Sequence, residues 1–109
     1  MKLKTRLEQT ELYDYYGAIL PPKHQEILQM YYYEDCGLSE IANIYGVSRQ
    51  AILYYIEKAE KRLGEMEEKL GFATKNKEIK KDISKLVSLI NDSNRAKAEK
   101  IIVDILEKL

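Results

Sequence analysis

The residues from Ser48 to Leu70 constrain the fold most strongly, because they repeat apolar side chains at a helical period and contain no proline. The apolar positions alternate spacings of four and three, the heptad pattern of a helix that buries one stripe. This heptad stripe comprises Ile52, Ile56, Ala59, Leu63, Met66 and Leu70. Such a helix is about 34 Å long, so its far half must pack on more than a small neighbouring motif. That partner is either a second chain or the C-terminal part of the same chain.

Two features before this helix predict a sharp turn between helices. The segment Leu38–Tyr45 has the apolar pattern of a short helix, and Gly46 follows it as the turn residue. Ser39 and Ser48 stand where a hydroxyl can cap each helix N-terminus. The residues expected in the shared core are Ile41, Ala42, Val47 and Ile52. This combination predicts a helix-turn-helix motif.

The rest of the chain also has helical periodicity, so the sequence predicts an all-α fold of about six helices. One helix ends at Leu20, a second runs from Pro22 to about Tyr33, and Gly37 is expected to adopt a left-handed conformation after it. After Gly71, residues 73–77 are expected to form a polar connector. Two further helices, 79–90 and 94–109, complete a C-terminal hairpin. We therefore expect domains 1–72 and 73–109, with the hairpin packing on the long helix or on a partner chain.

The charge balance is zero overall but uneven along the chain. The sequence has 18 Lys and Arg against 18 Asp and Glu; residues 1–72 carry a net −3 and residues 73–109 a net +3. A basic excess, the usual sign of nucleic-acid binding, is therefore missing from the half with the motif. Glu65, Glu67 and Glu68 are expected to be a solvated helix surface or a patch that recognises a basic partner.

Several functional classes are disfavoured by what the sequence lacks. The single Cys36 and the single His24 supply neither a metal-ligand set nor a nucleophile with its base. No glycine-rich phosphate loop is present. We therefore expect no enzyme activity, metal, cofactor or small-molecule substrate. No apolar stretch is long enough for a signal peptide or a membrane span, so a cytoplasmic location without membrane insertion is expected.

The predicted nucleic-acid contacts lie at the start of the long helix. They are Ser48, Arg49, Gln50, Tyr54, Lys58 and Lys61. Arg grips guanine and Gln grips adenine through paired hydrogen bonds, and the first turn of such a helix reaches base edges in the major groove. The same residues could instead be ordinary surface or meet a protein. The run Tyr31–Tyr33, with Tyr45, Tyr54 and Tyr55, is either a stacking platform for single-stranded RNA or, as we favour, core.

The sequence resembles the YlxM family of small bacterial proteins over about residues 12–72. The resemblance is carried by Leu20–Glu26, Tyr31–Asp35, Leu38–Ala42, Val47–Ile52 and Glu67–Gly71. More distantly, Leu20 to Leu63 resembles the helix-turn-helix of sigma-factor region four, which implies DNA binding. Leu53, Tyr54, Tyr55 and Glu57 depart from the family pattern and make the reading face less basic.

Two hypotheses about function follow from the motif and the resemblance. The first is a dimeric DNA-binding regulatory protein, whose two Arg49 residues would lie roughly 34 Å apart, or a multiple of that distance, to reach successive major grooves. The second is an adaptor that binds signal recognition particle protein or RNA without binding DNA, because genes of the YlxM family lie beside those of that particle.

Overall fold

The computed structural model describes residues 4–108, and every regular element in that range is helical. The elements are α1 Arg6–Tyr16, a 3₁₀ turn Gly17–Ile19, α2 Pro22–Tyr32, α3 Leu38–Tyr45, α4 Arg49–Leu70, α5 Phe72–Ser88 and α6 Arg95–Lys108. The predicted all-α fold is confirmed. The chain forms two compact units, Met1–Gly71 and Phe72–Leu109.

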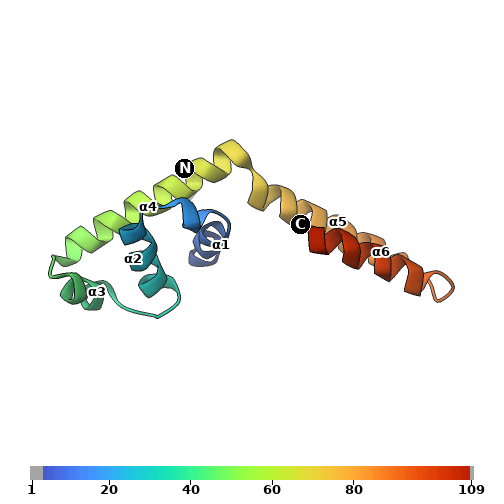
Figure 1. The fold of residues 1–109 in the computed structure, drawn as a ribbon, viewed down its shortest axis with the longest axis horizontal. Helices are drawn as coiled ribbons and strands as arrows, with labels where there is room; N and C mark the ends of the chain where they lie inside the picture. The colour runs from blue at the N-terminus through green and yellow to red at the C-terminus, as the bar shows by residue number, and fades with distance from the viewer. Residues whose placement is uncertain (1–3, 109) are drawn as a thin grey trace. The chain divides into compact units, whose positions relative to one another are not determined.

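The first unit is organised around α4, against which α3, α2 and α1 pack in that order from its N-terminal end (Figure 1). The core side chains come from all four helices and from the 3₁₀ turn. Those with almost no exposure include Tyr16, Leu20, Ile27, Leu28, Ile41, Ile52, Ala59 and Leu63. Burying this apolar surface supplies the main driving force for the unit.

The heptad stripe is buried within its own unit as far as Leu63. The far half of α4 is covered by α1, whose Tyr16 hydroxyl donates a hydrogen bond of 2.6 Å to Glu67 Oε1. At the end of the stripe Met66 is half-buried and Leu70 is exposed. Neither partner expected from the sequence is therefore needed for Ile52 to Leu63, because α3, α2 and α1 of the same unit cover this part of the helix.

The helix-turn-helix is formed as expected, but three local predictions were wrong. The N-cap of α3 is Gly37, not Ser39, and the side chain of Glu40 accepts a hydrogen bond of 3.3 Å from the Gly37 N–H. Because it caps α3, Gly37 has an extended backbone, and the left-handed residue after α2 is Asp35, with φ of 52°. Val47 is 37% exposed, because it lies in the turn at the edge of the core.

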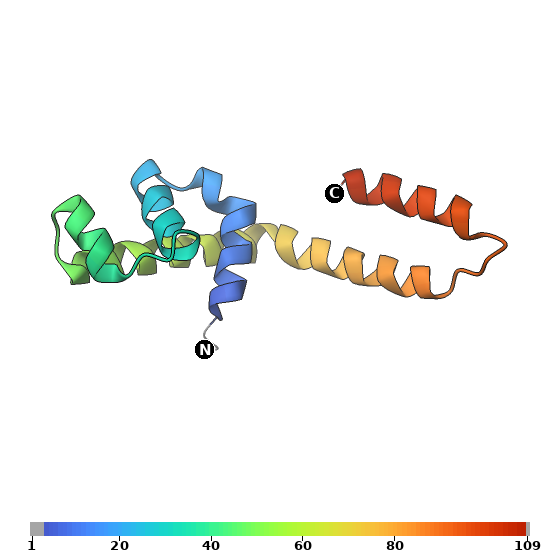
Figure 2. The same cartoon turned by 90° about the horizontal axis from the view of Figure 1, so that it is seen from below.

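The second unit is a helical hairpin in which α5 and α6 run antiparallel (Figure 2). The expected connector at residues 73–77 is helical instead, because α5 begins at Phe72 directly after the left-handed Gly71. The predicted break before α6 is confirmed. There, Asn91 Oδ1 accepts hydrogen bonds from the backbone N–H groups of Ser93 and Asn94, which favours the turn.

Candidate nucleic-acid interface

The start of α4 is fixed by a left-handed turn and a hydroxyl cap. Gly46 has φ of 66°, a conformation that costs an L side chain strain, and the Val47 N–H donates to the carbonyl of Ala42 at 3.0 Å. Ser48 then has an extended backbone, and its Oγ accepts from the Ala51 N–H at 3.1 Å. These contacts close α3 and hold the first turn of α4 in place.

The six residues predicted to contact nucleic acid are all exposed. The Ser48 hydroxyl is engaged in the cap, so its role in this structure is to form the helix start. With about 100° between successive residues of a helix, Gln50, Tyr54, Lys58 and Lys61 project within about 80° of one another. Arg49 projects from a neighbouring flank, about 100° from Gln50. The structure therefore gathers four of the predicted side chains on one outer face of α4.

This outer face combines an aromatic ring with unpaired cations. The Tyr54 side chain is 57% exposed, and Lys58 Nζ lies 5.6 Å from the centre of its ring. Among residues 4–108, no carboxylate oxygen lies within 4 Å of the charged nitrogens of Arg49, Lys58 or Lys61. Exposed Glu57 and Glu65 project from the same side of the helix and reduce its net positive charge.

A second group of basic residues lies where α2 begins beside α4; it includes the predicted Lys58, and sequence reasoning missed that Lys23 and His24 of α2 join it. We call Lys23, His24, Lys58 and Arg62 the α2–α4 basic cluster. Lys23 Nζ lies 4.7 Å from the ring centre of Tyr55 and 3.4 Å from its hydroxyl, and the His24 ring lies 5.6 Å from the Tyr55 ring. Lys23 and His24 are adjacent on α2, and Lys58 and Arg62 are four residues apart on α4, but only the packing of α2 on α4 brings the two pairs together.

The electrostatic environment of His24 reflects this clustering. Partial burial lowers the pKa of His24, and the positive charges of Lys58, Arg62 and Lys23 lower it further. Its Nδ1 atom is buried and has no hydrogen-bond partner within the described range. Burial and these three cations therefore both favour the neutral form of His24.

Most of the remaining tyrosines hold helices together. The Tyr32 hydroxyl donates to Glu60 and the Tyr33 hydroxyl to Asp14, while Tyr45 donates to Glu26 at 3.0 Å. The Tyr13 ring lies edge-on to that of Tyr32 at 6.1 Å. The stacking-platform interpretation of the run Tyr31–Tyr33 finds no support in these contacts. The favoured core interpretation was wrong for Tyr33 and Tyr54, which are exposed, and the other four tyrosines are half-buried at the edge of the core: Tyr31, Tyr32, Tyr45 and Tyr55.

The structure gives Cys36 no activating environment. Partial burial raises the pKa of the Cys36 thiol, and the nearby carboxylates of Glu40, Glu34 and Asp35 raise it further. A raised pKa leaves little of the nucleophilic thiolate at neutral pH. Within the part of the chain that the structure describes, no three His, Cys, Asp or Glu side chains are close enough to hold a metal ion.

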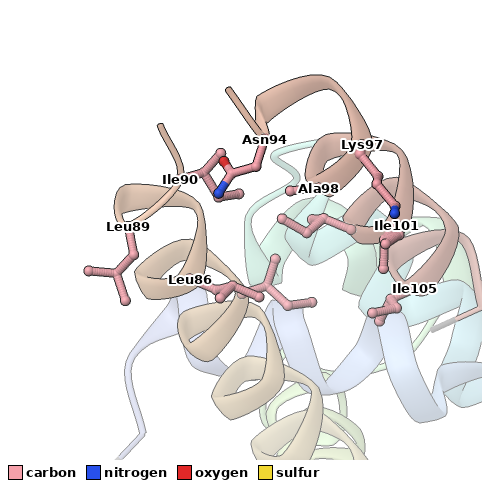
Figure 3. Close-up of a pocket in the computed structure, with 10 residues that line it drawn as sticks. Leu86, Leu89, Ile90, Asn94, Lys97, Ala98, Ile101 and Ile105 are labelled. Atoms are coloured by element: carbon pink, nitrogen blue, oxygen red, sulfur yellow. The ribbon is translucent and has the colours of Figure 1, made fainter. Parts of the chain in front are cut away.

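The hairpin carries an apolar groove of about 360 Å³ between α5 and α6. Figure 3 shows Leu86 on α5 facing Ile105 on α6 across it, with Leu89 pointing away. Ile102 is buried, whereas Leu86, Ile101 and Ile105 line the groove and are themselves exposed. None of the helices described, here or in the first unit, is long and apolar enough to cross a membrane.

Comparison with known proteins identifies the family. Residues 3–105 match the family model described as "Putative helix-turn-helix protein, YlxM / p13 like". The UPF0122 protein of Bacillus pumilus is 36% identical over 109 residues, which cover 100% of this chain and 99% of the relative. The UPF0122 protein TTE1463 of Caldanaerobacter subterraneus subsp. tengcongensis is 44% identical over 81 residues, 74% of this chain and 69% of the relative. This chain therefore belongs to the YlxM/p13-like family of helix-turn-helix proteins.

Proposed function

We propose that this protein is a non-enzymatic DNA-binding regulator that places the N-terminal half of α4 in the major groove of duplex DNA. The observation that carries the proposal is the outer face of α4, where Gln50, Tyr54, Lys58 and Lys61 are exposed together beyond a capped helix start. Membership of a helix-turn-helix family supports it.

Each side chain has a role suited to its chemistry. Arg49 and Gln50, in the first turn, would contact guanine and adenine edges. Lys58 and Lys61, farther along the helix, would meet phosphates and fix the register of the protein on the duplex. With so few cations per chain, we expect weak and strongly salt-dependent binding by one subunit.

A salt series of binding measurements tests this proposal. A random-sequence duplex of about 30 base pairs, roughly three helical turns, is titrated with the full chain by fluorescence anisotropy at several KCl concentrations. We expect Arg49→Ala and Lys58→Gln to weaken binding, with Lys58→Gln reducing the salt slope by about 0.9. Lys100→Gln on α6, which is exposed and does not line the hairpin groove, is the charge-matched control. Equal binding by all four proteins, or no binding by the wild type, would contradict the proposal.

The adaptor hypothesis is tested in the same titration. Its support is the net −3 charge of residues 1–72 and the genomic setting of the family. Signal recognition particle RNA takes the place of the duplex, and purified signal recognition particle protein is tested as a second partner. Binding to either component without binding to the duplex would favour the adaptor over the DNA-binding protein.

We further propose that the hairpin groove is covered by the same groove of a second copy. Units of fewer than about 40 residues usually need disulfides, metals or oligomerisation to be stable. The unit Phe72–Leu109 is shorter than this, and its sequence has no cysteine. Leu86, Ile101 and Ile105 line the groove and are exposed, and a two-fold contact would pack these same apolar side chains of two copies against one another. Such a dimer would present two α4 helices to one duplex.

Sedimentation of the full chain tests the dimer. We expect Ile105→Glu in the groove to yield a monomer and Val103→Glu, which is equally exposed but outside the groove, to leave the dimer intact. A monomeric wild type, or dissociation caused only by Val103→Glu, would rule out this interface.

A further inference from the structure

The α2–α4 basic cluster is placed where cations destabilise the free protein. Lys23 lies in the first turn of α2, which contains no acidic residue, and the N-terminal end of a helix carries a partial positive charge. His24 follows it and faces Lys58 and Arg62 of α4, whose charges act on it. Positive side chains therefore lie near the positive end of α2, and a bound anion would reduce the electrostatic repulsion among them.

Among the residues that the structure describes, the cations of the cluster are not held in ion pairs. Within residues 4–108, Lys23, Lys58 and Arg62 have no carboxylate oxygen within 4 Å of their charged nitrogens. Glu26, one turn after Lys23 on α2, accepts a hydrogen bond of 3.0 Å from the Tyr45 hydroxyl, and the Tyr45 ring centre is 5.7 Å from Lys23 Nζ. The cluster is therefore a site of local positive charge on a unit of net negative charge.

The cluster adjoins the outer face of α4. Lys58 belongs to both surfaces, and Arg62 projects about 40° farther round the helix axis than Lys58, towards α2. A duplex that receives the outer face of α4 in its groove has a phosphate backbone running along each side of that groove. The cluster lies on the flank of α4 where one such backbone would pass.

We propose that Lys23, Lys58 and Arg62 bind the phosphodiester backbone of duplex DNA beside the groove occupied by α4, and that His24 is the pH-sensitive member of this phosphate site. The proposal rests on the DNA-binding function proposed above. It adds Lys23, His24 and Arg62 to the interface and predicts a pH dependence that the outer face of α4 alone does not.

The sign of the pH dependence follows from linkage. In the free protein, burial and the cations Lys58, Arg62 and Lys23 lower the pKa of His24, whose ring lies 5.6 Å from that of Tyr55. A phosphate at the cluster adds negative charge and raises that pKa, so binding takes up a proton. Affinity is then highest below the pKa of the free protein and decreases as pH rises through the pKa of the complex.

Salt titrations test the phosphate contacts. With the same random-sequence duplex between about 50 and 200 mM KCl, the double variant Lys23→Gln/Arg62→Gln should lower the salt slope by about 1.8, the loss of two phosphate contacts. The control Lys80→Gln/Lys81→Gln makes the same change of net charge at exposed lysines of α5. An equal reduction in both double variants, or in neither, would overturn the phosphate site.

A pH series tests the role of His24, the only histidine of the chain. Between about pH 5 and 8, wild-type affinity should increase towards acid, by about tenfold for each unit by which phosphate raises the pKa, and His24→Gln should bind with no such dependence. A pH dependence that persists in His24→Gln would overturn its assignment. If Arg49→Ala weakens binding while the double variant and His24→Gln match the wild type, this inference fails and the proposed function stands. If the wild type binds no duplex, both fail.

Discussion

Replacing Leu63 by alanine tests whether α4 is stabilised by its own chain. Leu63 is 0% exposed in the single chain and lies in the half of α4 that α1 covers, whereas Leu70, on the same stripe, is 49% exposed. Leu63→Ala removes buried carbons worth about 0.8 kcal/mol each and leaves a cavity, so we expect a cost of about 3 kcal/mol. Leu70→Ala loses only about half of the transfer free energy and forms no cavity, so we expect about 1 kcal/mol.

The assay is urea unfolding followed by circular dichroism, at two protein concentrations about a hundredfold apart. If α1 covers Leu63, the difference of about 2 kcal/mol between the two variants is the same at both concentrations, because no second chain takes part. Equal costs for the two variants would refute the burial of Leu63. A cost of Leu63→Ala that changes with concentration would show that another chain covers the stripe.

Three further predictions concern the turn, the cap and a tyrosine contact. Gly46→Ala should lower the free energy of unfolding by about 1 to 2 kcal/mol, because φ is 66° at this position. Gly37→Ala, at φ of −75°, should lower it by less than about half of that amount. Thermal unfolding of both variants and the wild type measures the two costs. Ser48→Ala should lower the free energy of unfolding by about 1 kcal/mol, and Ser48→Asp should lower it much less, because only aspartate keeps an oxygen that can accept from the Ala51 N–H. Equal losses in the two variants would exclude a stabilising cap at Ser48. Burial and, second, the hydrogen bond to Asp14 raise the pKa of Tyr33 to about 12. The folded state therefore gains stability from the protonated Tyr33 hydroxyl below about pH 10, and this contribution should be lost as pH rises from about 10 to 12. If a Tyr33→Phe variant lost as much stability as the wild type over this pH range, the prediction would be contradicted.

The sequence predicts the helices well because their signals are local. Apolar spacing, Pro22 at a helix start, Gly46 in the turn and Ser48 as a cap all act within a few residues, and the structure confirms each of them. The prediction at Ser39 was wrong for a physical reason. Gly37 can cap α3 through the returning Glu40 side chain, and the sequence alone offers no way to choose between the two starts.

Sequence reasoning predicted the α4 part of the candidate site and not the α2 part. The exposure of Gln50, Tyr54 and Lys58 follows from their helical phase relative to Ile52 and Ile56. The α2–α4 basic cluster depends on which flank of α4 the start of α2 contacts, and no pattern along the chain encodes that. Its one available signal was Lys23, a cation in the first turn of a helix, where the helix dipole disfavours it.

The net charge of −3 on residues 1–72 disfavours DNA binding less than its size suggests, because several of the carboxylates bind tyrosine hydroxyls inside the unit and lie away from the outer face of α4. Glu60 and Glu67 accept hydrogen bonds from Tyr32 and Tyr16, and Glu60 projects about 160° round the α4 axis from Lys58. A phosphate is attracted or repelled mainly by charges within a Debye length, about 8 to 10 Å in ordinary salt. The relevant quantity is therefore the charge of one flank of α4, where Lys23, Lys58 and Arg62 are held in no ion pair with any residue that the structure describes. Exposed Glu57 and Glu65 lower the net positive charge there without neutralising any one cation directly.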